Sequence, residues 1–366
     1  MTAAQAGPAR TKATPPMTAS RKSRDRRRLG GAAVLAAALL VAGCGSGAGT
    51  AASSSESGSG TGLKKVTFQL NFAAGGFNAG FSLAKQKGYY KNEGLDVTIV
   101  KGNGSATTAQ LVASGQADIA YADAVAVIQL IAKGAPIKVI STIYQANPNE
   151  VSALKATGIK SIADLKGHSI GVPSGSSQTP LLPVLLKANG LSPKDVKQVN
   201  LPGAALVPSL LQKNVDAILG SMDFYGIQLA QQGAETDNYL FADHGVPTVS
   251  TSIIARTDYL KSDGDTVKKF VAASIKGWQD SLADPKGAID ALKKTFPEVK
   301  PEQATSELTV TLPLLCKNGA QSIGKAEPKA WADTQKVLAE VGSVPQDIDP
   351  TTYYTYDYLP STLPAC

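Results

Sequence analysis

The sequence has very little histidine, cysteine or tryptophan. Its 366 residues include two histidines, three cysteines and two tryptophans. Neither His168 nor His244 lies near a cysteine in the sequence, so the side chains that usually bind zinc are not grouped. We therefore expect no metal site and no cofactor.

Most of the chain also has no excess of basic over acidic residues. The formal net charge of +7 comes from lysines and arginines before Cys44, and residues 45–366 carry equal numbers of basic and acidic side chains. The only arginine after Cys44 is Arg256, whose place near a strand end favours a structural ion pair over ligand binding. A neutral chain of this kind does not attract nucleic acid, so we expect no nucleic-acid partner.

A hydrophobic run long enough to cross a membrane does not follow the basic N-terminal residues. The apolar stretch there, "LGGAAVLAAALLVAG" at residues 29–43, is shorter than the roughly 20 residues that a spanning helix needs. Basic residues followed by a short apolar run are typical of a signal peptide, which we assign to residues 1–43. Translation can start at Met1 or at Met17, and Met17 opens the more typical signal sequence.

The sequence "VAGC", which ends at Cys44, is similar to the bacterial lipobox, in which the cysteine sulfur carries a diacylglyceryl group. The resemblance implies lipidation at Cys44 and an anchor in the cell membrane. The alternative is an ordinary signal peptide with an incidental cysteine. With lipidation, the protein works outside the cytoplasmic membrane while attached to it.

A low-complexity segment follows the cysteine. "GSGAGTAASSSESGSGTG", residues 45–62, has almost no apolar side chain larger than alanine and cannot bury a core. We interpret residues 44–62 as the lipidated cysteine and a flexible tether. The folded part begins near residue 63, and we expect it to be monomeric.

The two remaining cysteines are Cys316 and Cys366. An exported chain enters an oxidising compartment, where a disulfide between them is the simplest interpretation. The alternative is a pair of unrelated thiols. Such a bridge would attach the C-terminal tail "YLPSTLPAC" to a predicted helix.

Segments typical of strands and helices alternate from residue 64 to about residue 221. "KVTFQLNF", "LDVTIVKG" and "ADIAYAD" read as strands, whereas "GFSLAKQKGYYKNEG" reads as one helix that ends at Gly94. Alternation of this kind predicts an α/β fold. A helix, a turn and a strand also recur with an offset of 98 residues, which aligns Asp118 with Asp216. We infer two similar α/β lobes.

Two runs rich in β-branched residues mark where the chain crosses between these lobes. "NEVSALKATG" begins at residue 149 and "VPTVSTSIIARTDYL" at residue 246. We therefore assign residues 63–149 and 249–366 to lobe 1, which includes C-terminal helices, and residues 150–248 to lobe 2.

Several motifs in fixed order resemble one protein family. They are "FSLAKQKGYYKNEGLDVTIVKG", "LVASGQADIAYADA", "KGAPIKVISTIYQANP", "GIKSIADLKGHSIGVPSGSS" and "VPSLLQKNVDAILG". Together they are similar to solute-binding proteins of ABC importers, in the branch that includes sulfonate-, nitrate- and thiamine-pyrimidine-binding proteins. The resemblance covers about residues 66–338.

The resemblance implies a type II periplasmic-binding fold. Its two α/β lobes are joined by two crossing strands and close on one small molecule, which is presented to an ABC permease. An extracytoplasmic sensor or adaptor without a transport role is a second possibility. A third is an enzyme similar to the eukaryotic pyrimidine synthase, which uses a histidine and a cysteine-rich motif. The absence of any cysteine between Cys44 and Cys316 argues against that enzyme.

The loop "GVPSGSSQTPLL" at residues 171–182 is the first candidate binding segment. It lies between a predicted strand and a predicted helix with Pro180 in its first turn, where free N–H groups and hydroxyls can hold an oxygen-rich group. Plain helix capping is the alternative. A catalytic serine is disfavoured, because no base is placed beside it and the G-x-S-x-G turn is missing. The predicted ligand-binding residues of this loop are Ser174, Ser176, Ser177 and Gln178.

Other candidates lie at strand ends, because ligands in open α/β sheets bind outside the carboxyl ends of strands. Relatives often carry a histidine where Asn78 stands, and this departure weakens the assignment of a thiamine pyrimidine as ligand. Phe72 can equally be a core residue, and Ser105 and the two aspartates can be helix caps. The predicted binding residues of this group are Phe72, Asn78, Ser105, Asp123, Tyr144, Gln145 and Asp223.

These residue types predict the character of the ligand. Hydroxyl groups accept an oxygen-rich group, whereas Asp123 and Asp223 would repel a bare inorganic anion and favour an amine or a ring N–H. We therefore expect a small organic molecule, either sulfonate-like or a heterocycle of the pyrimidine type, rather than nitrate.

Overall fold

The computed structural model describes residues 62–317 and 319–366. The predicted signal peptide, Cys44 and almost all of the predicted tether lie outside the described residues. Within the described part, no helix has the length and apolar character that crossing a membrane requires.

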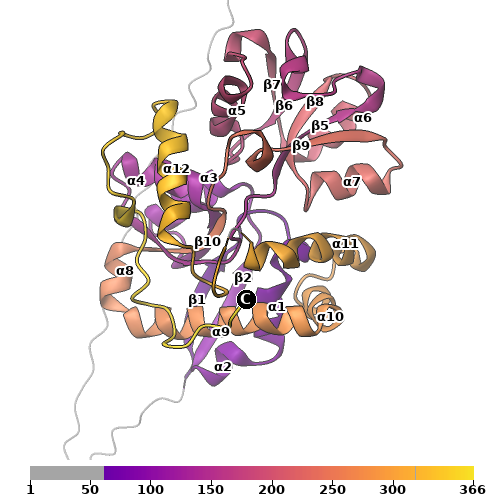
Figure 1. Cartoon of the computed structure of the whole chain (residues 1–366). Helices are drawn as coiled ribbons and strands as arrows, with labels where there is room; N and C mark the ends of the chain where they lie inside the picture. The colour runs from indigo at the N-terminus through magenta and orange to yellow at the C-terminus, as the bar shows by residue number, and fades with distance from the viewer. Residues whose placement is uncertain (1–61, 318) are drawn as a thin grey trace, which may run out of the picture. The chain divides into compact units, whose positions relative to one another are not determined.

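The first of two five-stranded sheets has the order β2-β1-β3-β10-β4. Its central strands β1 and β3 are parallel to each other, and β10 runs antiparallel to both β3 and β4. Figure 1 shows β10 returning to this sheet late in the chain. The strand bounds are β1 Lys64–Gln69, β2 Leu95–Val100, β3 Ile119–Asp123, β4 Ile137–Thr142 and β10 Thr251–Arg256.

The second sheet has the order β7-β6-β8-β5-β9 and repeats the pattern of the first. Here β6 is parallel to β7 and β8, while β5 is antiparallel to β8 and β9. The strand bounds are β5 Asn149–Leu154, β6 Ser169–Pro173, β7 Lys197–Leu201, β8 Ala217–Ser221 and β9 Thr236–Leu240. The α/β fold class expected from the alternating segments is confirmed.

The two aspartates of the predicted repeat make the same contact in both sheets. The carboxylate of Asp118 accepts a hydrogen bond from the backbone N–H of Thr67 at 3.1 Å, just before β3. The carboxylate of Asp216 accepts one from the N–H of Ser169 at 2.7 Å, just before β8. In each sheet an acidic side chain thus fixes the start of one central strand against its neighbour.

The chain passes twice between the sheets. Residues 143–148 lead from β4 to β5, and residues 241–250 lead from β9 back to β10. The strands that follow these passages, β5 and β10, are the antiparallel strands of their sheets. Both passages lie beside the cavity described below.

The helices that lie between strands in the chain are α1 Ala79–Gln86, α2 Tyr89–Asn92, α3 Ser105–Ala113, α4 Ala124–Ala132, α5 Leu182–Ala188, α6 Leu206–Leu211 and α7 Tyr225–Gln231. The single helix expected to run to Gly94 is wrong. Gly88 has a left-handed conformation with φ +76° and separates α1 from α2. A glycine adopts this conformation without steric cost, so the chain turns there.

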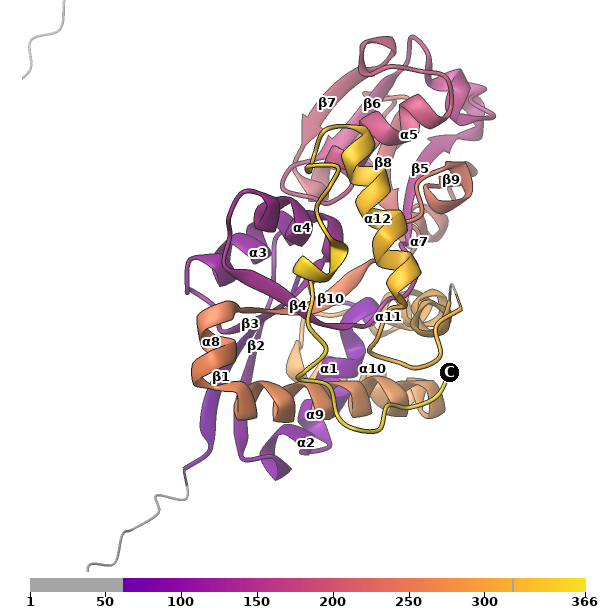
Figure 2. The same cartoon turned by 60° about the vertical axis from the view of Figure 1, so that its left-hand side comes forward.

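The C-terminal helices are α8 Thr257–Ser262, α9 Gly264–Ala283, α10 Pro285–Thr295, α11 Pro301–Thr311 and α12 Pro328–Glu340. Helix α9 packs against α1 at the first sheet, which Gly80 allows because a Cβ there would lie 2.3 Å from Trp278. Helix α12 instead contacts α5 of the second sheet, as Figure 2 shows. Trp331 and Leu338 of α12 belong to one buried cluster with Leu182 and Leu185 of α5.

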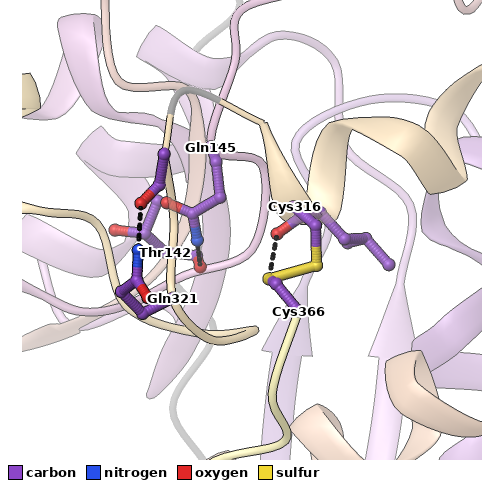
Figure 3. The surroundings of a disulfide bond; sticks show 7 residues. Thr142, Gln145, Cys316, Gln321 and Cys366 are labelled. Atoms are coloured by element: carbon purple, nitrogen blue, oxygen red, sulfur yellow. Dashed lines mark hydrogen bonds between the residues drawn. A yellow bond between two sulfur atoms is a disulfide. The ribbon is translucent and has the colours of Figure 1, made fainter.

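The tail after α12 returns to the first sheet. The backbone N–H of Val139 in β4 donates to the carbonyl of Tyr353, and the N–H of Thr355 donates to the carbonyl of Val139. Cys366 forms a disulfide with Cys316, with Cα atoms 5.4 Å apart (Figure 3). The last residues are therefore covalently attached to the short 3-10 helix Leu312–Cys316.

Candidate functional site

A cavity lies between loops of the two sheets. Its walls come from the segments at and after the carboxyl ends of the parallel strands β1, β2, β3, β6, β7 and β8, together with both passages between the sheets. This is the place where open α/β sheets bind ligands. A ligand here would contact residues of both sheets.

Four residues predicted from the first half of the chain line this cavity. Phe72 follows β1, Ser105 begins α3, Asp123 ends β3, and Tyr144 follows β4. Five predicted residues from the second sheet face them: Ser174, Ser176, Ser177, Gln178 and Asp223. The structure therefore brings together side chains as far apart in the sequence as Phe72 and Asp223. Their contact with a ligand stays a prediction.

Asn78 and Gln145 do not line the cavity. The side chain of Asn78 is used within its own turn, where its amide donates to the carbonyl of Ala73 and its oxygen accepts from the N–H of Gly75. The side-chain amide of Gln145 donates to the carbonyl of Thr142 at 3.0 Å, as drawn in Figure 3. Both polar side chains stabilise the local backbone. A position after a strand therefore does not by itself place a side chain in the cavity.

The serine loop does not lead directly into an α-helix. Thr179–Leu181 form a 3-10 turn, and α5 begins only at Leu182. The hydroxyl of Thr179 donates to the carbonyl of Pro173 at 3.0 Å and lies 3.1 Å from the hydroxyl of Ser176. The expected helix start with Pro180 in its first turn is therefore only partly correct, and the loop is held by its own hydroxyls.

The serine loop also touches the first sheet directly. The backbone N–H of Ala106 in α3 donates to the carbonyl of Gly175 at 3.2 Å. Both neighbouring glycines have positive φ, +113° at Gly104 and +70° at Gly175. A Cβ at Gly104 would lie 2.4 Å from the Gly175 carbonyl oxygen, so only glycine permits this approach.

Asp123 connects the cavity to both passages between the sheets. One carboxylate oxygen caps α4 by accepting from the N–H of Val125 at 2.9 Å. The other accepts from the side-chain amide of Asn147 at 3.2 Å, and the hydroxyl of Ser250 lies at 3.5 Å. Asn147 belongs to the first passage and Ser250 to the second. Asp123 is thus both a helix cap and a cavity residue.

Asp123 and Asp223 are both nearly inaccessible, with exposed fractions of 5%. Burial raises the pKa of Asp123 to about 7, although the N–H of Val125 and neighbouring hydroxyl and amide groups partly offset it. Burial likewise raises the pKa of Asp223 to about 6, against a smaller opposing effect of Ser221. Neither carboxylate forms a salt bridge with any of the described residues.

Aromatic side chains form much of the cavity wall. Phe72 from the first sheet meets Phe224 from the second, with ring centroids 5.1 Å apart and nearly perpendicular planes. Phe77 contacts the same ring at 5.6 Å, and Tyr225 lies at 4.9 Å from it. The sequence analysis missed Phe77, Phe224 and Tyr225. The sequence "DFYG", which begins at Asp223, was a usable signal for Phe224 and Tyr225.

Three further cavity residues carry buried polar atoms without a hydrogen-bond partner: the side-chain oxygen of Asn71, the hydroxyl of Tyr121 and the side-chain nitrogen of Asn149. Such atoms cost free energy unless a ligand or water satisfies them. The oxygen and nitrogen of an asparagine amide are assigned from their surroundings, so each amide can present either atom. These residues were also missed by the sequence analysis.

The chemistry that these groups support is binding. Among the described residues, no three histidine, cysteine or acidic side chains are grouped as metal ligands. The residues around the cavity include hydroxyls and carboxylates but no histidine or cysteine. The arrangement therefore offers donors, acceptors and aromatic surface to a molecule held between the two sheets.

The chain is similar to curated proteins over most of its length. A riboflavin-binding protein, RibY, from Chloroflexus aurantiacus is 26% identical over 313 residues, which cover 81% of this chain and 87% of the relative. A formylaminopyrimidine-binding protein from Halalkalibacterium halodurans is 25% identical, covering 74% of this chain and 83% of the relative. A Saccharomyces cerevisiae 4-amino-5-hydroxymethyl-2-methylpyrimidine phosphate synthase, THI11, is 27% identical over 60% of this chain and 68% of its own length.

The fold matches solved structures. The alkanesulfonate-binding protein SsuA from Xanthomonas axonopodis pv. citri, bound to MOPS, superposes with a TM-score of 0.64. The match covers 80% of this chain and 99% of SsuA at 17% identity, so it supports the fold alone. The expected periplasmic-binding fold is confirmed. A model of the family described as NMT1/THI5 like matches residues 78–288, more than half of the sequence, and the chain belongs to this family.

Proposed function

We propose that this protein captures a small organic molecule in the cavity between its two sheets and delivers it to the permease of an ABC importer. The observation that carries the proposal is that three residues lining one cavity, Asn71, Tyr121 and Asn149, each have a buried polar atom without a hydrogen-bond partner among the described residues. The names of the riboflavin- and formylaminopyrimidine-binding relatives support a small-molecule ligand.

A heterocycle is favoured over a sulfonate. Phe72, Phe77 and Phe224 offer aromatic surface to a flat ring, whereas the charged side chains of the cavity, Asp123 and Asp223, are acidic. A sulfonate group would be placed beside two carboxylates with no lysine or arginine among the lining residues. Hydrogen bonds to the polar edge of the ring then come from the residues that we predicted to bind ligand, including Ser174, Ser176, Ser177 and Gln178.

For a ligand to enter the cavity and be held there, the two sheets must first move apart and then approach each other. We infer that residues 150–248 move as lobe 2 against lobe 1 through the passages at residues 143–148 and 241–250. A ligand that contacts both lobes favours the closed state by its higher affinity for that state. The hydrogen bond from Ala106 to Gly175 belongs to the closed state.

An enzymatic role is the weaker candidate. The yeast relative is a synthase, but the cavity of this chain offers no histidine or cysteine. A sensor that binds the same ligand without feeding a permease shares the whole cavity with an importer component. Uptake measurements in a deletion strain separate these two roles, because only the importer component is needed for uptake.

We also propose that Cys44 carries a lipid that anchors the protein to the outer face of the cell membrane. Metabolic labelling with a palmitate analogue should mark the wild-type chain and leave Cys44→Ala unlabelled. Equal labelling of both proteins would exclude this site of modification. Cys316→Ala with Cys366→Ala is the matched control, because it removes the other two cysteines and should keep the label.

The direct test of the proposed function is identification of the bound molecule. The full-length chain, purified in a non-ionic detergent and then denatured, should release a small organic molecule that mass spectrometry detects. The same preparation of a Tyr121→Phe and Asn149→Ala double variant should release much less of it. Release of no molecule from the wild type, together with unchanged uptake in a deletion strain, would contradict the proposal.

A further inference from the structure

The residues around the cavity have charge of only one sign. They include two aspartates, Asp123 and Asp223, and no lysine, arginine or histidine. The two carboxylates come from opposite sheets, since Asp123 ends β3 and Asp223 follows β8. A molecule that fills the space between the sheets therefore meets a carboxylate on each side.

Further carboxyl groups stand behind Asp223. Glu150 on β5 and Glu307 on α11 are almost fully buried, and the charge of Asp223 acts on both. Glu150 accepts a hydrogen bond from the hydroxyl of Ser152, while Glu307 accepts from the N–H of Gly76 and from Gln303. None of the salt bridges of the described residues includes Asp223, Glu150 or Glu307. Buried carboxylates usually have a cationic partner, and the part of the chain that the structure describes supplies none for these three.

Two donors that could attract an anion are used within the protein. At the start of α3, the N–H of Ala106 donates to the carbonyl of Gly175. On the second sheet, the hydroxyl of Thr179 donates to the carbonyl of Pro173. The remaining donors around the cavity are neutral hydroxyl, amide and backbone groups, so no charged donor among the lining residues balances the aspartates.

Aromatic rings complete the site. Phe72, Phe77, Phe224, Tyr225, Tyr121 and Tyr144 all line the cavity. The electron-rich face of an aromatic ring attracts a cation, and the attraction strengthens when water is excluded. Rings and carboxylates together form the kind of site that holds an organic cation, while Asn71 and Asn149 offer hydrogen bonds to its edge.

We propose that the ligand is a flat organic cation, held with its positive charge between Asp123 and Asp223 and with its ring against the aromatic wall. The inference rests on the proposed function and names the ligand class of the same cavity. The raised pKa of both aspartates supports it, because an ionised carboxylate at either position lacks a cation until the ligand arrives. It excludes sulfonates and nitrate as physiological ligands.

The test uses three probes of one shape and different charge. All three probes contain the same planar ring. Benzamidinium is positively charged, benzamide is neutral and benzoate is negatively charged. Calorimetry at pH 8 on the full-length chain, freed of any co-purified molecule, should give at least ~10-fold tighter binding for benzamidinium than for benzamide. Benzoate should not bind. Equal binding of benzamide, tighter binding of benzoate, or no binding of benzamidinium overturns the proposal.

Two substitutions then locate the charge. Asp223→Asn should weaken benzamidinium about 30-fold or more and change benzamide little, because truncating one partner of a desolvated charge pair costs roughly 2 kcal/mol or more. Asp123→Asn should act in the same direction while it still caps α4, since asparagine is an equally good cap. Asp243→Asn is the matched control: it removes the same charge from an exposed position outside the cavity and should change nothing. An equal loss for benzamidinium and benzamide in Asp223→Asn would assign a packing role to Asp223 and overturn the placement of the charge.

The two proposals fail in different ways. A neutral or anionic molecule released from the purified protein would overturn the cation and leave capture of a small molecule intact. A chain that releases no molecule and is not needed for uptake would contradict the proposed function, even if benzamidinium binds to the aspartates.

Discussion

Gly104 and Gly175 bring the two sheets into backbone contact at one edge of the cavity. Both residues have positive φ, and a side chain at Gly104 would meet the carbonyl of Gly175. The hydrogen bond from Ala106 to Gly175 forms only at this distance. The contact therefore depends on glycine at both positions, because neither residue has a side chain.

Gly104→Ala should separate the two loops. The added methyl group would lie 2.4 Å from a backbone oxygen that cannot rotate away, so the loops must move apart to accommodate it. Hydrogen exchange measured by mass spectrometry should become faster at residues 104–108 and 174–179. Affinity for the cavity ligand should fall as well, because the closed state is disfavoured.

Gly134→Ala is the control for this experiment. Gly134 also has positive φ, +89°, but no atom lies within 4 Å of the position of a Cβ. Both variants should lose about 1 kcal/mol of stability from the backbone conformation, and only Gly104→Ala should change exchange in the two loops. Similar exchange in both variants would mean that the contact does not hold the loops together.

The sequence predicted several cavity residues from a polar residue type at a position after a strand. Hydroxyl and acidic residues directly after strands, such as Ser177 and Asp223, reached the cavity because parallel strand ends converge there. Tyr121 was missed because β3 is buried along its whole length, so no alternation of polar and apolar residues marks a face. Asn78 does not line the cavity, and its side chain forms local hydrogen bonds that spacing does not reveal.

At the scale of elements, the C-terminal tail acts as a strap across the first sheet. Tyr353 and Thr355 exchange backbone hydrogen bonds with Val139 in β4, and Tyr358 donates to the carbonyl of Leu260. The disulfide to Cys316 attaches its far end. Each contact alone is weak, and the bridge keeps all of them in place.

Cys366→Ser should lower the stability of the protein and release the tail. The bridge spans a sequence separation of 50, for which loop entropy predicts a contribution of about 4 kcal/mol. Urea denaturation should show the loss, and the wild type under reducing conditions should show the same loss. A reductant that destabilises Cys366→Ser as much as the wild type would point to another cause.

The order of elements was largely predictable, whereas one boundary was not. The repeat that aligns Asp118 with Asp216 signalled two similar units, and both carboxylates accept an N–H at the start of a central strand. The break at Gly88 was overlooked because the apolar residues on its two sides, including Leu83 and Tyr90, continue a helical spacing. A glycine inside such a pattern can end a helix as easily as interrupt it.

At the scale of the whole molecule, four buried carboxyl groups make stability depend on pH. Burial raises the pKa of Asp123, Glu150 and Glu307 to about 7 and that of Asp223 to about 6. A group whose pKa is higher in the folded state than in the unfolded state binds more protons when folded. These groups stabilise the folded state fully when the pH is below their pKa in the unfolded state, which is near 4. This stabilisation is lost as the pH rises through 6 to 7.

Without ligand, the melting temperature should therefore be higher at pH 5 than at pH 8. Scanning calorimetry over this range is the measurement. Asp223→Asn should flatten the dependence, because an amide has no proton to lose, and Asp243→Asn should leave the slope unchanged. A stability that rises between pH 5 and pH 8 would contradict the burial of uncompensated carboxylates.

The hydrogen bonds of Asp123 have a consequence for how this scaffold can change its specificity during evolution. Its carboxylate holds both passages between the sheets as well as the cavity, through Asn147 and Ser250. In the proposed binding role, a mutation of Asp123 would alter ligand choice and the two passages between the sheets at once, so substitutions at this position are constrained. The side chain of Asp223 instead has a hydrogen-bond partner in Ser221, which belongs to β8 and to neither passage. New ligand preferences should therefore arise first by substitutions on the side of Asp223, while the side of Asp123 stays fixed.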